Sequence, residues 1–105
     1  MRELPIPSEN EGDMNATEMI RVWLGNGTCN VSMLLGMYED AEDSDDDELW
    51  IWGNILSDVA QHIANGFKQS HGWDETETMS QLRKHFNTEI KNRAPNLTGG
   101  YLADN

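Results

Sequence analysis

Two pairs of charged side chains have the spacing that acid–base chemistry needs. Asp58 and His62 lie four residues apart, and so do His85 and Glu89. On a helix, residues at this spacing are neighbours, so the carboxylate can orient the imidazole ring for proton transfer. The same pairs are common on helix surfaces that have no catalytic role. We therefore predict a candidate polar site at Asp58 and His62 and assign no catalytic residue.

An acidic run forms the largest concentration of potential metal ligands. Eight of the ten residues from Glu39 to Glu48 are Asp or Glu. A calcium loop of the EF-hand type that started at Asp43 would have Glu48 in place of the turn glycine and Asn54 in place of the bidentate glutamate, so this motif is excluded. The second half of the run fits the first turn of a helix, where backbone N–H groups and the helix dipole favour carboxylates.

The first half of the run precedes that helix and has three interpretations. It can be a solvated loop, a docking loop for a basic protein partner, or a weak site for a divalent ion. The four carboxylates concerned are Glu39, Asp40, Glu42 and Asp43.

Other classes of site lack their motifs. Cys29 is the single cysteine, and the sequence has no CxxC or HExxH spacing, so no zinc site or other metal site is predicted. A net charge of −12 repels phosphate backbones and anionic lipids. No apolar stretch is long enough for a membrane span or a secretion signal. We therefore predict no cofactor, no nucleic-acid partner, no membrane partner and a cytoplasmic location, which a single cysteine also fits.

A β-hairpin is the first element that the sequence predicts. Asn26-Gly27 is the preferred pair for a type I′ turn, and such a turn sets Val22 opposite Val31. Alternate residues of the two strands then share one apolar face. We expect this face to be buried, including Cys29 as a small core residue, and its members are Ile20, Val22, Leu24, Cys29, Val31 and Met33.

Two helices are predicted after the acidic run. Apolar residues recur at intervals of three and four from Leu49 to Phe67, which indicates a helix over residues 45–69. Residues 74–77 have the pattern of a capping box and start a second helix, which should end before Pro95.

These elements predict an α+β fold in a single domain. An N-terminal arm and an antiparallel β-hairpin are followed by two antiparallel α-helices packed on one sheet face. The domain spans residues 18–94, between an extended arm at residues 1–17 and a flexible C-terminal tail at residues 95–105.

Three segments resemble a known family. They are "RELPIP" at residues 2–7, "IRVWLGNGTCNVSM" at residues 20–33 and "WIWGNILSDVAQHIANGF" at residues 50–67. Together they are similar to domain-of-unknown-function family 5076, a family of small proteobacterial proteins. The likeness is weaker after Trp73, and the acidic insertion here is more acidic than the usual pattern. The resemblance implies a bacterial cytoplasmic origin and adds no mechanism.

A surplus of apolar surface predicts self-association, because two strands alone leave edges and faces uncovered. The candidate interface of a homodimer consists of Met19, Trp23, Leu34, Ile51 and Ile55. A monomer is the alternative if Leu4 and Ile6 of the arm pair as a third strand and the tail residues Tyr101 and Leu102 cover the rest of the apolar surface. We expect a non-enzymatic interaction module that self-associates. The alternatives are an acidic adaptor that docks on a basic protein and a small enzyme that uses Asp58 and His62.

Overall fold

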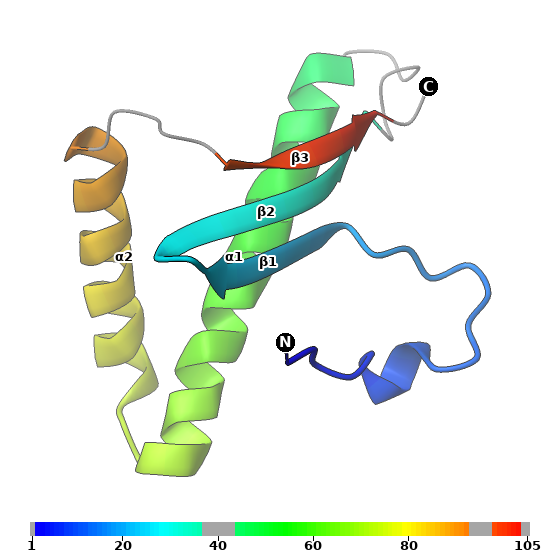
Figure 1. The fold of residues 1–105 in the computed structure, drawn as a ribbon. Helices are drawn as coiled ribbons and strands as arrows, with labels where there is room; N and C mark the ends of the chain where they lie inside the picture. Colours follow the sequence, from blue (N-terminus) through cyan, green and yellow to red (C-terminus); the bar gives the residue numbers. More distant parts are fainter. Residues whose placement is uncertain (1, 37–43, 93–97, 104–105) are drawn as a thin grey trace. The chain divides into compact units, whose positions relative to one another are not determined.

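The computed structural model describes residues 2–36, 44–92 and 98–103 and contains helices and strands in an α+β arrangement (Figure 1). In chain order the elements are η1 (Ser8–Asn10), β1 (Ile20–Gly25), β2 (Thr28–Leu35), α1 (Ser44–His71), α2 (Glu75–Asn92) and β3 (Thr98–Ala103). They form two compact units, a sheet unit of residues 1–35 and 98–102 and a helix unit of residues 36–97 and 103–105. The predicted hairpin followed by two helices is confirmed.

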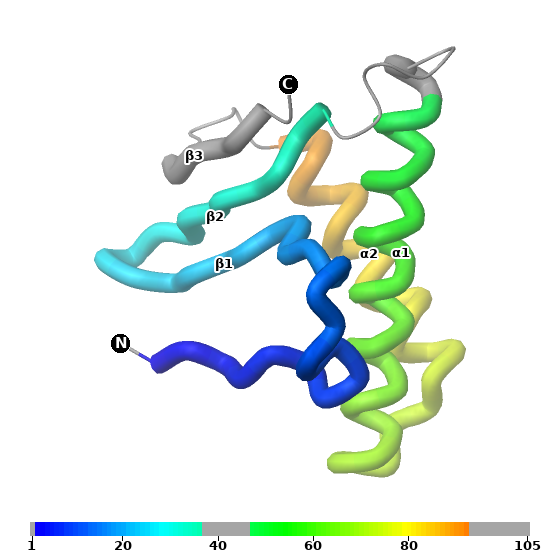
Figure 2. Tube along the Cα trace, turned by 90° about the vertical axis from the view of Figure 1, so that its right-hand side faces the viewer, coloured from blue at the N-terminus to red at the C-terminus, as the bar shows by residue number. Residues whose placement is uncertain are grey.

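The hairpin has the predicted register. Asn26 and Gly27 both have positive φ, 53° and 73°, as the two central residues of a type I′ turn require. Strands β1 and β2 pair antiparallel with Val22 opposite Val31, as the turn predicts. The pairing continues past the strand ends, because the Leu34 N–H donates to the Met19 carbonyl oxygen at 2.9 Å. Figure 2 shows the two strands running side by side into this tight turn.

A third strand, β3, completes the sheet in the order β1-β2-β3 (Figure 1). It lies in the range 95–105, for which the sequence predicts a tail without a strand. Gly99 and Gly100 lower the strand propensity of this segment, and its pairing with β2 joins residues that are far apart in the sequence. Leu4 and Ile6 of the arm are not the third strand, and their side chains are 88% and 69% exposed.

The apolar face of the hairpin is less buried than the sequence predicts. Val22 is 55% exposed, Leu24 is 83% exposed, and Cys29 is also exposed. The prediction that Cys29 is a core residue is therefore wrong. Period-2 alternation correctly places these residues on one face, but burial also requires a covering layer, which a strand pattern does not report.

The arm is connected to the hairpin by charged side chains. Arg21 on β1 forms ion pairs with Glu3 at 3.1 Å and with Glu18 at 2.6 Å. The hydrogen bond from the guanidinium lowers the pKa of the Glu18 carboxyl, and the same bond raises the pKa of Arg21. These side chains are exposed, so the contacts orient the arm without forming a core.

The helix unit is a pair of helices that meet at a tight turn and diverge away from it (Figure 1). Gly72 ends α1 with φ 71°, and its N–H donates to the Lys68 carbonyl oxygen at 2.9 Å. Asp74 then caps α2, since its Oδ2 accepts the Glu77 N–H at 2.8 Å. Ala64 of α1 is completely buried.

Candidate functional site

An apolar groove of about 410 Å³ lies between α1 and α2 beside their turn. The turn holds the helix ends together, while their divergence leaves the groove open. Side chains of both helices line it, together with Trp73 and Asp74 of the turn between them. The lining residues are Ile63, Phe67, Trp73, Asp74, Glu77, Thr78, Gln81, Leu82 and His85.

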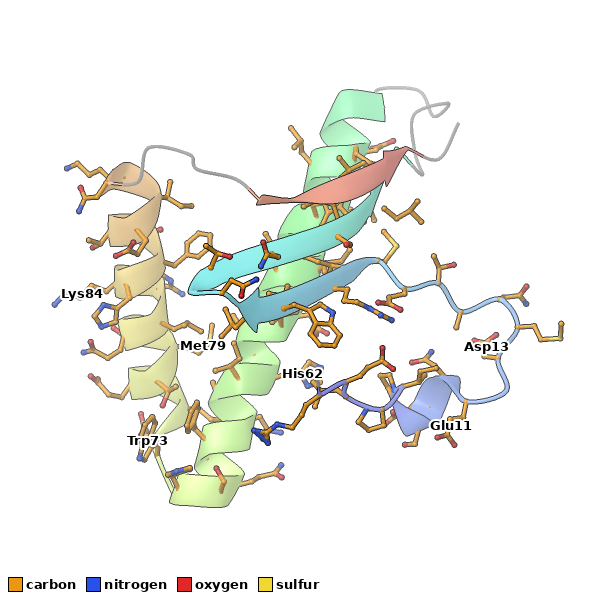
Figure 3. All side chains as sticks on the ribbon, viewed as in Figure 1. Glu11, Asp13, His62, Trp73, Met79 and Lys84 are labelled. Carbon is orange, nitrogen blue, oxygen red and sulfur yellow. The ribbon has the colours of Figure 1, made fainter. Side chains whose placement is uncertain are left out.

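Three aromatic rings close the turn end of this groove. Phe67 and Trp73 are stacked, with ring centroids 4.5 Å apart and an interplanar angle of 8°. His71 contacts both rings, at 5.2 Å from Phe67 and 5.3 Å from Trp73. The positive φ of Gly72 turns the chain back, which returns Trp73 onto the preceding helical turn. Figure 3 shows Trp73 at this junction of the two helices.

Several of the polar side chains that line the groove form local hydrogen bonds. Asp74 accepts the Glu77 N–H, and the Asp74 carbonyl oxygen accepts the Thr78 hydroxyl at 2.9 Å. Gln81 donates to the Glu77 carboxylate at 3.0 Å. These hydrogen bonds of Asp74, Glu77 and Thr78 stabilise the start of α2. Because these polar groups already bond to one another, the groove is better suited to bind apolar side chains than to carry out acid–base chemistry.

The predicted polar site forms, but it lies outside the groove. His62 Nε2 is 3.3 Å from Asp58 Oδ2, as their spacing predicts, and the side chains are 77% and 74% exposed. His62 projects from the side of α1 that faces away from α2 (Figure 3). Of the second pair, His85 lines the groove. Helix spacing therefore brings Asp58 and His62 together at an exposed position outside the groove.

The five predicted interface residues are all half-buried. They are Met19, Trp23, Leu34, Ile51 and Ile55. Greater exposure is found at other large apolar side chains, and the helix unit holds most of them. In that unit the exposed ones are Leu49, Trp50, Leu56, Val59, Ile63, Trp73, Phe86 and Ile90.

The candidate docking loop, with Glu39, Asp40, Glu42 and Asp43, lies outside the described residues. The residues before and after this loop are connected by a hydrogen bond, in which the Gly36 N–H donates to Glu48 Oε1 at 2.7 Å. Within residues 2–36, 44–92 and 98–103, no group of three or more His, Cys, Asp or Glu side chains could hold a metal ion. In the same residues, no helix is long and apolar enough to cross a membrane.

The sequence patterns described above predict neither the groove nor the aromatic cluster. Phe67 and His71 have the four-residue spacing of helix neighbours, and Trp73 follows the terminating Gly72. This pattern could have indicated the cluster. The groove depends on how far the helices diverge, and no residue pattern reports that angle.

Comparison with known proteins supports the fold and the family. A solved structure of a candidate pyruvate dehydrogenase from the photosynthetic bacterium Rhodopseudomonas palustrus is similar, with 21% identity, a TM-score of 0.63, and coverage of 93% of this chain and 92% of that chain. At this identity the likeness shows a shared fold alone. A search of curated proteins finds no match. The model of the family described as a domain of unknown function (DUF5076) matches residues 3–94, in agreement with the sequence resemblance. The chain therefore belongs to the DUF5076 family.

Proposed function

We propose that this protein is a small, non-enzymatic interaction module that self-associates as a homodimer. One observation carries the proposal. Ala64 is the single buried hydrophobic side chain among the described residues, while large apolar side chains are exposed on both units. Leu24 of the sheet unit is 83% exposed, and Leu49 of the helix unit is 72% exposed.

Exposure on this scale favours a partner because a chain of this length normally buries much more. A domain of about 100 residues buries roughly 60–68% of the surface of its unfolded chain. Soluble monomers rarely expose contiguous apolar patches above a few hundred Å². A two-fold dimer covers such a surface with its own copy, and two-fold dimers are the commonest oligomers.

The geometry gives the enzyme alternative less support. Asp58 and His62 are in contact, but both are exposed and neither lines the groove. Acid–base catalysis depends on a pocket that orients the substrate and excludes water around such a pair. No catalytic role is therefore proposed for them.

Binding of a basic protein partner is a second proposal, favoured by the excess of carboxylates. Eight of the 19 acidic residues lie between Glu39 and Glu48. A partner held by this run should dissociate as the salt concentration rises, whereas an apolar dimer should not. We also propose a bacterial cytoplasmic location, which fits a single cysteine that can form no disulfide within the chain.

The concentration dependence of thermal stability tests the proposed self-association. Mass action makes the Tm of a dimer rise with protein concentration, and a 100-fold increase should raise it by about 5–10 °C for a chain of this size. The Tm is measured from circular dichroism melts at protein concentrations from about 1 to about 100 µM. A Tm that is constant across this range would refute the dimer.

A further inference from the structure

Strand β1 lies at an open edge of the sheet. The order β1-β2-β3 leaves β2 as the hydrogen-bonded neighbour of β1 among the described residues (Figure 1). Soluble proteins usually protect such an edge with lysine, proline or a β-bulge, because an unpaired strand accepts a strand from another chain. The sequence of β1, IRVWLG, contains neither lysine nor proline, and its pairing with β2 has no bulge. The edge of β1 is therefore a candidate site for strand addition.

The hydrogen-bond pattern of the hairpin decides which residues of β1 face this edge. In an antiparallel pair, residues that exchange hydrogen bonds with the neighbouring strand alternate with residues whose N–H and C=O groups point away from it. The Leu34 N–H donates to the Met19 carbonyl oxygen, so Met19 and every second residue after it bond to β2. In the part of the chain that the structure describes, no other segment forms a backbone hydrogen bond with the residues between them. The residues with outward-pointing backbone groups are Ile20, Val22 and Leu24.

The N-terminal arm lies on the open side of β1 but does not pair with it. In both views residues 2–7 run beside β1, on the side away from β2 (Figures 1 and 2). Glu3 reaches Arg21 at 3.1 Å, and both side chains are exposed. Exposed ion pairs contribute little to stability, so a partner strand can displace the arm at small cost. Pro5 and Pro7 of the arm also lack the N–H groups of a regular ladder.

A second copy of β1, running antiparallel, fits this edge in one register. A two-fold axis at Val22 sets Val22 of one copy against Val22 of the other, and Ile20 against Leu24. Every outward-facing residue of each strand then has a partner in the other strand. A shift of two residues loses one of these pairs, and in one direction it also sets Arg21 against its own copy. Like charges directly opposite each other are destabilising, so the register centred on Val22 is preferred.

The same register gives complementary side-chain pairs on both faces of the sheet. On one face, the outward-facing residues of the two copies form a continuous apolar row, in which the now exposed Val22 and Leu24 gain neighbours. On the other face, Arg21 lies opposite Trp23 of the second copy, whose ring offers a cation–π contact to the guanidinium. Arg21 is the charged residue of β1, and it meets no like charge in this strand pair.

We infer that β1 pairs with β1 of a second copy about a two-fold axis at Val22, which joins two three-stranded sheets into one. The inference rests on the proposed self-association and assigns it to the edge of the hairpin. A helix cannot occupy this edge in the same way, because its backbone groups already bond within the helix. Of the five predicted interface residues, Trp23 belongs to this contact.

Substitutions at Val22 test the register, because this residue faces its own copy. Val22→Lys should weaken the dimer at least about 10-fold, since it sets two ammonium groups opposite each other, and Val22→Glu should do the same with two carboxylates. An equimolar mixture of the two variants should restore the dimer, because lysine then faces glutamate. Val22→Thr is the matched control, since threonine is also β-branched, favours strands and adds no charge. Sedimentation equilibrium over a concentration series measures the dissociation constants, and circular dichroism verifies folding.

Amide hydrogen exchange of the wild-type chain, followed by NMR, gives a second measurement that does not depend on the folding of a variant. The Trp23 N–H lies inside the hairpin ladder and should exchange slowly at every protein concentration. The Val22 and Leu24 N–H groups should exchange rapidly in the dilute monomer. At concentrations where the dimer forms, they should exchange at least about 10-fold more slowly, because they donate to the second copy.

The outcomes distinguish the β1 contact from self-association in general. A dimer in which the Val22 and Leu24 amides still exchange rapidly, or a dimer that persists in folded Val22→Lys, would overturn the β1 contact and leave the proposed self-association intact. Folded variants whose mixture stays monomeric would overturn the register centred on Val22. A monomeric wild type would overturn both proposals, and slow exchange of the Val22 amide in that monomer would assign the edge to the arm of the same chain.

Discussion

Replacing Gly27 with valine tests the turn that sets the register of the sheet. Gly27 has φ 73°, in the left-handed region, where a β-branched side chain is strongly disfavoured. The turn cannot relax to an ordinary conformation without changing the pairing of Val22 with Val31. A one-residue slip would move every apolar side chain of that strand to the opposite face.

The cost of this substitution comes from the backbone alone. A Cβ added at Gly27 would meet no atom within 4 Å, so no steric clash contributes. A non-glycine residue held in the left-handed region costs about 1–3 kcal/mol. For a chain of about 100 residues, each kcal/mol lowers the Tm by roughly 4–8 °C, so Gly27→Val should lower the Tm by about 4–24 °C.

Gly25 provides a matched control two residues away. It also has no atom within 4 Å of an added Cβ, but its φ is not positive, and it lies in strand β1 opposite Thr28. Gly25→Val should leave stability unchanged or raise it by up to about 1 kcal/mol, because valine favours strands. Gly27→Asn should lose less than Gly27→Val, since asparagine tolerates this conformation. Thermal melts at one fixed protein concentration compare the variants, and equal Tm values for Gly27→Val and Gly25→Val would refute the assigned turn.

Three further predictions concern the cap, the arm and the acidic run. In a urea titration, Asp74→Ala should lower the free energy of unfolding by about 1 kcal/mol, because α2 loses its N-terminal cap. Asp58→Ala, which removes an exposed ion pair, should change the free energy of unfolding by less than about 0.5 kcal/mol in the same titration. The pKa of Glu18, followed by NMR, should lie below the ordinary glutamate value and return toward it in Arg21→Ala. Because the pKa of Glu18 is lower in the folded chain than in the unfolded chain, this pair contributes a small stabilisation above the unfolded-state pKa. That contribution is lost as the pH falls through the folded-state pKa. Calorimetric titration of residues 39–48 in the intact chain with calcium or zinc should show no defined stoichiometry, and micromolar binding at one site would contradict the excluded motif.

Local signals in the sequence predict most of the elements correctly. Asn26-Gly27 determines the hairpin register because the turn type constrains both of its φ angles. Gly72 and Asp74 mark the end of α1 and the start of α2 because each provides a specific backbone or capping interaction there. The contact of Asp58 with His62 follows from helix geometry.

Features that depend on distant residues were not predictable in this way. Strand β3 joins residues 98–103 to β2, and a glycine-containing segment without strong alternation gives no local sign of that pairing. The exposure of Leu24 and Cys29 was not predicted because burial depends on residues distant in the sequence, which a strand pattern does not report. The groove beside Phe67 likewise arises from the divergence of two helices.

Sedimentation equilibrium of the wild-type chain tests the central claim, self-association, most directly. The experiment measures mass without dependence on shape, and the chain mass is 11.9 kDa. At micromolar concentrations we predict a mass of twice that value, unchanged by high salt because the proposed contact is apolar. A mass of 11.9 kDa at every concentration would contradict the proposed homodimer.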